Sequence, residues 1–83
     1  MSQDRVELHA EPWSWTLDQM PEGLLLSVMC GTVGVYERAI MLKSDEVDAW
    51  CRGGPPTLAS LVEAIRNDVT GAVFAERYRP DLT

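Results

Sequence analysis

The sequence predicts an α+β fold in which a three-stranded antiparallel meander is followed by two helices packed on one face of the sheet, in the order β-β-β-α-α. Three observations lead to this prediction. Apolar and polar residues alternate within residues 12–19, residues 24–30 are almost continuously apolar, and residues 58–69 carry apolar side chains at helical spacing. The chain of 83 residues is long enough for one core, so we expect a single small domain over residues 1–83.

The first strand is expected to follow a short arm. Residues 1–11 are polar and show no sustained period, which favours a flexible N-terminal arm. Trp13, Trp15 and Leu17 then fall on one side of an alternating segment, as in a half-buried strand. Gly23 follows where a hairpin connection needs a positive φ, so a turn to the second strand is expected there.

The second and third strands are expected to flank a glycine-containing turn. Residues 24–30 are apolar on both faces apart from Ser27, which indicates a central strand. Residues 35–43 are predicted to be the third strand, because the run is short and a helix-start signal follows it. The intervening Gly31–Gly34 segment lacks the dinucleotide-binding fingerprint and the Lys-Ser/Thr ending of a phosphate loop, so it is interpreted as a hairpin turn.

Two helices are expected in the C-terminal half. The first is predicted to be capped by Ser44, whose hydroxyl can accept a backbone N–H bond, and to be ended by Gly53 in the left-handed conformation. A Gly-Gly-Pro-Pro segment breaks it, and the second helix is predicted to be capped by Thr57. The apolar face of the second helix comprises Leu58, Leu61, Val62, Ile65 and Val69. Three side chains are expected to anchor the tail that follows: Val73, Phe74 and Tyr78.

Composition limits the classes of partner. Thirteen acidic residues outnumber seven basic ones, which gives a formal net charge of −6. This charge disfavours nucleic acid and anionic membrane as partners and favours a basic protein. The start of the chain has no apolar segment typical of a secretion signal, and no stretch approaches the roughly 18 apolar residues of a membrane span. A cytoplasmic location with free thiols is therefore expected.

The reactive residues are too few to predict a catalytic or metal site. His9 is the single histidine, and Cys30 and Cys51 lie far apart in the sequence, whereas a structural zinc site needs four such ligands. A Cys30–His9 dyad would require a base held in place, and His9 lies in the expected arm. We therefore predict no cofactor, no metal and no enzymatic activity.

The favoured hypothesis is a non-enzymatic protein that binds another protein, as an inhibitor, an immunity factor, or a regulatory or accessory subunit. Aromatic side chains commonly supply much of the binding energy at such interfaces. The candidate partner-binding residues are Trp13, Trp15, Tyr36, Trp50 and Tyr78. Self-association into a homodimer, through an exposed edge of the first or third strand or an apolar helix face, is a second hypothesis nested in the first.

A different class of function centres on a thiol. Cys30 is expected at a strand end before a glycine turn, where backbone amides can lower a thiol pKa. The alternative hypothesis is therefore a small thiol-dependent or ligand-binding protein built on Cys30 and the Gly31–Gly34 turn.

Overall fold

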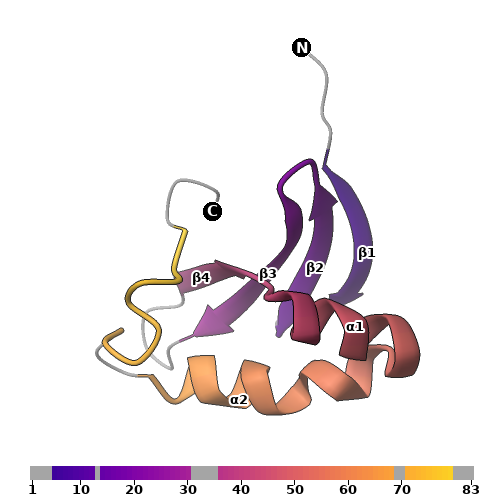
Figure 1. The fold of residues 1–83 in the computed structure, drawn as a ribbon. Helices are drawn as coiled ribbons and strands as arrows, with labels where there is room; N and C mark the ends of the chain where they lie inside the picture. The colour runs from indigo at the N-terminus through magenta and orange to yellow at the C-terminus, as the bar shows by residue number, and fades with distance from the viewer. Residues whose placement is uncertain (1–4, 13, 31–35, 69–70, 80–83) are drawn as a thin grey trace.

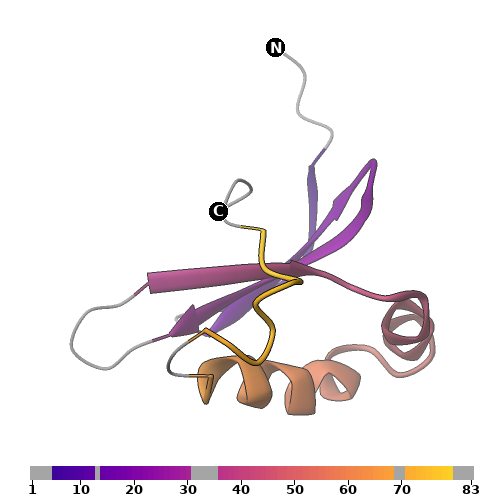
Figure 2. The same ribbon diagram turned by 60° about the vertical axis from the view of Figure 1, so that its left-hand side comes forward.

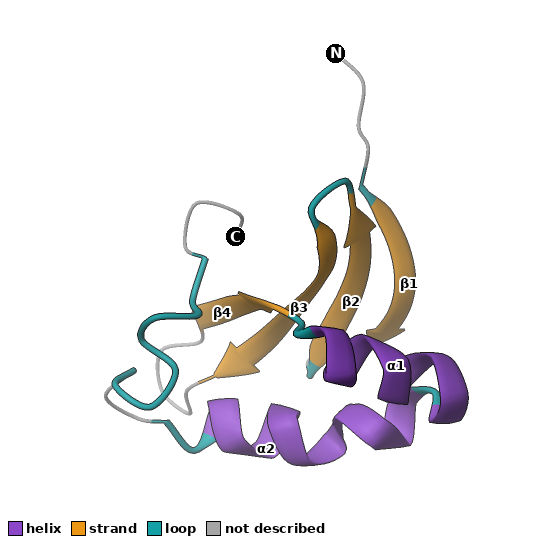
Figure 3. Cartoon of the chain, viewed as in Figure 1, coloured by secondary structure: helices purple, strands orange, loops and turns teal. Residues whose placement is uncertain are grey.

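The computed structural model is a four-stranded antiparallel sheet accompanied by two helices (Figures 1 and 3). The structure describes residues 5–12, 14–30, 36–68 and 71–79. The strands are β1 (Val6–Glu11), β2 (Trp15–Met20), β3 (Gly23–Cys30) and β4 (Tyr36–Met41), and they lie side by side in chain order. They are followed by α1 (Ser44–Gly53), a 3-10 turn (Pro55–Leu58) and α2 (Ala59–Arg66).

The predicted α+β class is confirmed, but the predicted number of strands was wrong. Residues 6–11, expected to belong to a flexible arm, instead form β1 and pair with β2 along the whole strand. This pairing satisfies backbone groups of β2 that would otherwise lie at the edge of the sheet. Two side-chain contacts hold β1 in place. Arg5 Nε lies 2.8 Å from Asp18 Oδ2, and the ring centroids of His9 and Trp15 are 4.8 Å apart.

A β-bulge changes the direction of the side chains within β1. Glu7 lies opposite Asp18 and His9 lies opposite Leu17, so Leu8 is an extra residue in the ladder. Without the bulge, Glu7 and His9 would share one face of the sheet. With it, His9 turns toward the helices, where it meets Trp15.

The other strands follow the predicted meander. β3 is central, with β2 on one side and β4 on the other. Gly23 has a φ of 140° in the β2–β3 hairpin, which confirms the expected need for glycine there. The predicted Gly31–Gly34 turn and Trp13 lie outside the described residues.

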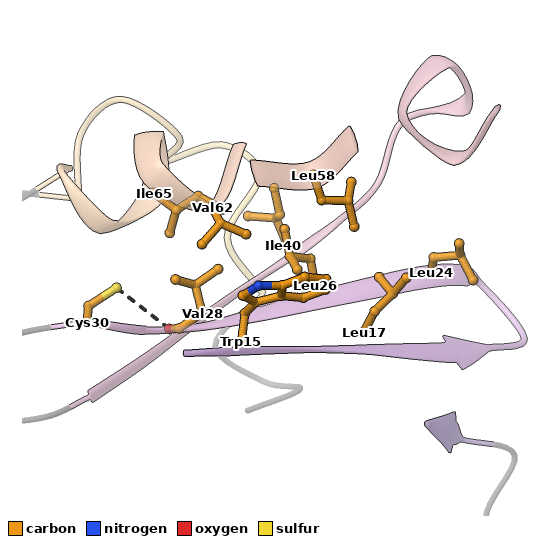
Figure 4. Packing of buried hydrophobic residues seen from close by; sticks show 10 residues of the cluster. All are labelled: Trp15, Leu17, Leu24, Leu26, Val28, Cys30, Ile40, Leu58, Val62 and Ile65. Atoms are coloured by element: carbon orange, nitrogen blue, oxygen red, sulfur yellow. Dashed lines mark hydrogen bonds between the residues drawn. The ribbon is translucent and has the colours of Figure 1, made fainter. Parts of the chain in front are cut away.

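The core lies between one face of the sheet and α2 (Figure 4). The sheet contributes side chains that alternate along β2, β3 and β4, and these point toward the helical layer. The buried cluster comprises Trp15, Leu17, Leu24, Leu26, Val28, Cys30 and Ile40 from the sheet and Leu58, Val62 and Ile65 from the helical layer. Complete burial of one such aliphatic side chain stabilises the fold by roughly 1.5–3 kcal/mol, so this layer is the main source of stability.

The caps of the first helix each lie one residue away from those predicted. The first helix is capped at Lys43 rather than at Ser44, and the Lys43 N–H donates to Glu46 Oε1 at 2.7 Å. The left-handed glycine that ends it is Gly54, with a φ of 72°, rather than Gly53. Neither described helix has the length and apolar character needed to cross a membrane.

The second helix begins one residue later than predicted. Thr57 does not cap it but lies inside the 3-10 turn, where both its amide and its hydroxyl donate to the Gly54 carbonyl at 3.1 and 2.6 Å. Two prolines open this turn, because their fixed φ suits a first helical turn and their missing N–H groups need no partner there. The sequence pattern therefore gave the correct helical face, while the local turn displaced the start of α2 to Ala59.

Candidate functional site

The two edges of the sheet differ in their covering. Along the β4 edge, Tyr78 forms an antiparallel bridge with Ile40, and the Arg79 N–H donates to the Ala39 carbonyl at 2.7 Å. We call residues 71–79 the C-terminal segment. It runs beside β4 in both ribbon views (Figures 1 and 2). This segment covers the edge that the sequence had suggested as an open third-strand edge.

Asp68 fastens the C-terminal segment to the end of α2. Its buried carboxylate accepts a hydrogen bond from the Tyr78 hydroxyl at 2.7 Å and bonds from the Val73 and Phe74 amides, each at 3.3 Å. Burial pushes the pKa of the Asp68 carboxyl upward. The three hydrogen bonds and the nearby Arg38 charge outweigh that effect, so the pKa lies below its ordinary value.

A second fastening joins the segment to α1. Arg77 makes a charged contact of 2.6 Å with Glu46 Oε1 and donates to the Met41 carbonyl at 3.0 Å. Phe74 and Tyr78 pack against the core, as predicted for the tail. Val73 was also predicted to be an anchor, but its side chain is 74% exposed, because its amide rather than its side chain holds the turn.

Arg38 completes this closed edge. Its guanidinium donates to the Asp68 carbonyl just beyond α2, where a positive charge complements the helix dipole. The same group lies over the rings of Tyr36 and Tyr78, at 5.0 and 5.3 Å from their centroids. Two of the predicted aromatic anchors therefore flank one arginine, and together they stabilise the β4 edge.

The Tyr78 contact predicts an alkaline change in stability. Burial, followed by the hydrogen bond and the charge of Asp68, raises the pKa of Tyr78 from 10.0 to about 12. The folded state then holds the phenolic proton more tightly than the unfolded state does. This contribution to stability is fully present below pH 10 and is lost as the pH rises through about 12.

We therefore expect the free energy of unfolding to fall between pH 10 and about pH 12. Tyr78→Phe should remove the part of this fall that comes from the phenol. Urea titrations at several pH values measure the free energy of unfolding of both proteins. A Tyr36→Phe background leaves one tyrosine, so tyrosinate absorbance then reports Tyr78 alone. Titration of Tyr78 near pH 10 in the folded protein would contradict the assignment.

The other edge of the sheet is the outer side of β1. Within the described ranges, β2 is the one strand that pairs with β1 and no other strand lies beyond it, so we call this side the open edge. Val6 is 56% exposed and Leu8 is 38% exposed, which makes them two of the few large apolar side chains facing solvent. The edge thus combines a strand that has no outer neighbour among the described strands with apolar surface.

An aromatic contact joins the open edge to the first helix. His9 lies against Trp15 and also approaches Trp50 of α1, with ring centroids 6.1 Å apart. Its Nε2 lies 2.7 Å from Glu11 Oε2 in the same strand. These contacts make β1 a firmly positioned strand rather than a loose arm.

The structure separates the predicted partner-binding residues. Trp15 is buried in the core, so its indole is not a surface anchor, and Trp50 is half-buried beside it against His9. Tyr36 is 40% exposed and Tyr78 is half-buried, and both lie at the opposite edge around Arg38. These four described aromatic residues therefore do not form one exposed patch.

The thiol hypothesis gains no support from the surroundings of Cys30. Its side chain is 2% exposed and its thiol donates to the Val28 carbonyl at 3.6 Å. Burial raises the pKa of the Cys30 thiol, against the smaller opposing effects of the Arg38 and Arg66 charges, so the sulfur is protonated at neutral pH. Cys51 is free and exposed. Among the described residues, no three His, Cys, Asp or Glu side chains gather closely enough to hold a metal ion.

Comparisons with protein-family models, with curated proteins and with solved structures found no match. The functional interpretation therefore depends on the chemistry of the open β1 edge. The sequence did not predict this site, because residues 1–11 were interpreted as an arm. The alternation of Val6, Leu8 and Ala10 with Glu7, His9 and Glu11 was the available signal for a strand.

Proposed function

We propose that the protein is a non-enzymatic binding module that takes up an extended segment of another protein along the outer edge of β1. The observation that carries the proposal is the difference between the two sheet edges: the C-terminal segment covers β4, whereas β1 has no outer neighbour among the described strands. Strand addition at an open edge is a common mode of peptide recognition, in which backbone hydrogen bonds supply affinity and alternate side chains supply specificity.

The dimensions of β1 suit this mode of binding. Its six residues span about 20 Å, enough for a short peptide strand. Each backbone hydrogen bond to the peptide contributes a net of about 0.5–1.5 kcal/mol to the binding free energy. Val6 and Leu8 add apolar contact with the peptide. The contacts of Arg5 with Asp18 and of His9 with Trp15 position the strand before a partner arrives, which lowers the entropic cost of binding.

The same edge carries features that limit indiscriminate pairing. Natural sheets protect open edges with bulges, charged side chains and proline. Here Leu8 forms the bulge, Glu7 and Glu11 are exposed acids, and Pro12 follows the strand. We interpret these features as selectivity, because they disfavour most strands while leaving the backbone groups accessible.

Two matched valine substitutions test the proposal. Val6 lies on the open edge and Val73 lies on the C-terminal segment at the other edge, and both are exposed. We expect Val6→Lys to remove a partner captured from the source cells and Val73→Lys to retain it. Amide hydrogen exchange of the captured complex should show new protection in β1.

A partner that is retained by Val6→Lys, or that leaves exchange in β1 unchanged, would refute binding at this edge. Circular dichroism and thermal unfolding of both variants verify that each substitution leaves the fold intact. Surface substitutions of this kind usually change stability by no more than about 0.5 kcal/mol.

A further inference from the structure

We infer that the occupant of the β1 edge is a basic extended segment of another protein, with aliphatic residues between its lysines or arginines. This inference rests on the proposed function and names the chemistry of the partner. The chain itself carries a formal charge of −6, which attracts basic partners and repels acidic ones over distance.

The local charges at the edge agree with the net charge. Glu7 and Glu11 are exposed acids on β1. The charge of Arg5 is balanced by Asp18, to which it donates at 2.8 Å. At the other end of β1, the Glu11 carbonyl accepts from the Ser14 amide, and the Ser14 hydroxyl binds Arg66.

Arg66 does not cancel the negative charge of the edge, because it also lies 3.6 Å from Glu63. Arg5 and Arg66 thus each lie close to an acid that is not on β1. Glu7 and Glu11 are two further acids on β1 itself, and His9 Nε2 lies 2.7 Å from Glu11 Oε2.

The bulge places these two acids on opposite faces of the sheet. Glu7 is paired with Asp18 and Glu11 with Trp15, and neighbouring residues of β2 point to alternate faces. Trp15 and Asp18 lie three positions apart along β2, so their partners on β1 face opposite sides of the sheet. A complementary strand therefore needs one basic residue on each face.

A second copy of this chain fits the edge poorly. Two β1 strands paired about a twofold axis would bring the Leu8 bulges together, and the bulge interrupts the regular ladder that such a dimer needs. Two chains of charge −6 also repel one another. The observations thus favour a basic partner over a homodimer.

A pair of blocked hexapeptides tests the inference by NMR titration at low and at physiological salt. The probe is Thr-Lys-Val-Val-Arg-Thr, whose two basic residues emerge on opposite faces of a strand, and its counterpart has glutamate at both basic positions. We expect the basic peptide to bind about tenfold more tightly and to shift the amide signals of β1. We also expect added salt to weaken binding of the basic peptide.

Charge reversal on the protein supplies the matched controls. Glu7→Lys and Glu11→Lys should each weaken binding of the basic peptide about fivefold. Glu76→Lys makes the same change in net charge on the C-terminal segment and should weaken binding less than twofold. The basic peptide with N-methylated backbone amides keeps its charge but loses its backbone N–H donors. We expect this peptide not to bind.

The possible failures are distinguishable. Equal binding of the acidic peptide, retained binding of the N-methylated peptide, or equal effects of Glu7→Lys and Glu76→Lys would overturn the basic-strand inference. So would a dimer detected by light scattering and abolished by Val6→Lys. A captured partner that docks on β1 through a segment without basic residues would overturn the inference and leave the proposed function standing. Capture that is insensitive to Val6→Lys removes the proposed function itself.

Discussion

Leu26→Ala is expected to lower the free energy of unfolding by about 4 kcal/mol. Leu26 lies on central β3, is fully buried, and faces α2 within the core cluster. Removing its side chain loses the transfer free energy of three carbons and leaves a cavity that the surrounding strands can fill only in part. Domains of this size have total stabilities of about 4–12 kcal/mol, so the variant should lose at least about a third of its stability.

Urea or thermal unfolding followed by circular dichroism measures this loss. Leu8→Ala is the matched control, because the same truncation on the outer edge removes a side chain that already faces solvent. We expect it to cost less than about 1 kcal/mol. Similar losses for both variants would mean that β1 is buried and would contradict the assignment of an open edge.

Tyr78→Ala is expected to lower the free energy of unfolding by about 3 kcal/mol. The substitution removes the ring that packs against the core, the hydroxyl that donates to Asp68, and the surface on which Arg38 lies. Tyr78→Phe keeps the ring and should cost about 1 kcal/mol, which separates the hydrogen bond from the packing.

The same variant also tests how β4 is covered. Without the Tyr78 ring, the bridge to Ile40 loses its main support, so the outer amides of β4 should exchange faster with solvent. The opened edge should also make the variant more prone to aggregate. If β4 kept its protection in Tyr78→Ala, the C-terminal segment would not be what covers that edge.

The elements with the strongest patterns could be predicted from the sequence. The nearly continuous apolar run of β3 predicted a central strand, and the helical spacing of Leu58, Val62 and Ile65 predicted the face that packs on the sheet. Both signals depend on burial, which selects residue type directly. The helix ends were less well predicted. Ser44 is the better N-cap residue by type, yet the cap is Lys43, and Gly53 and Gly54 are equally suited to the left-handed end.

The open edge could not be predicted to the same extent. Strict alternation in residues 6–11 would place Val6, Leu8 and Ala10 on a buried face, yet all three are exposed. The bulge at Leu8 reverses the pattern and directs His9 inward, onto an aromatic surface contributed by another strand and a helix. Such a contact depends on tertiary structure that local periodicity does not encode.

The contacts that cover the β4 edge likewise could not be predicted from local sequence. Asp68 binds the hydroxyl of Tyr78 and the amides of Val73 and Phe74, all in the segment that follows it in the sequence. Arg77 reaches Glu46, which lies far away in the sequence. The charges of these residues were visible in the sequence, but their pairing required the fold.

Residue-resolved amide hydrogen exchange, compared between the free protein and its complex with the partner captured from cells, is the sharpest test of binding along β1. We expect the outer amides of β1 to exchange faster than those of the other strands in the free protein and to gain the largest protection in the complex. Protection confined to β4 or to the helices, with β1 unchanged, would rule out β1 as the binding edge.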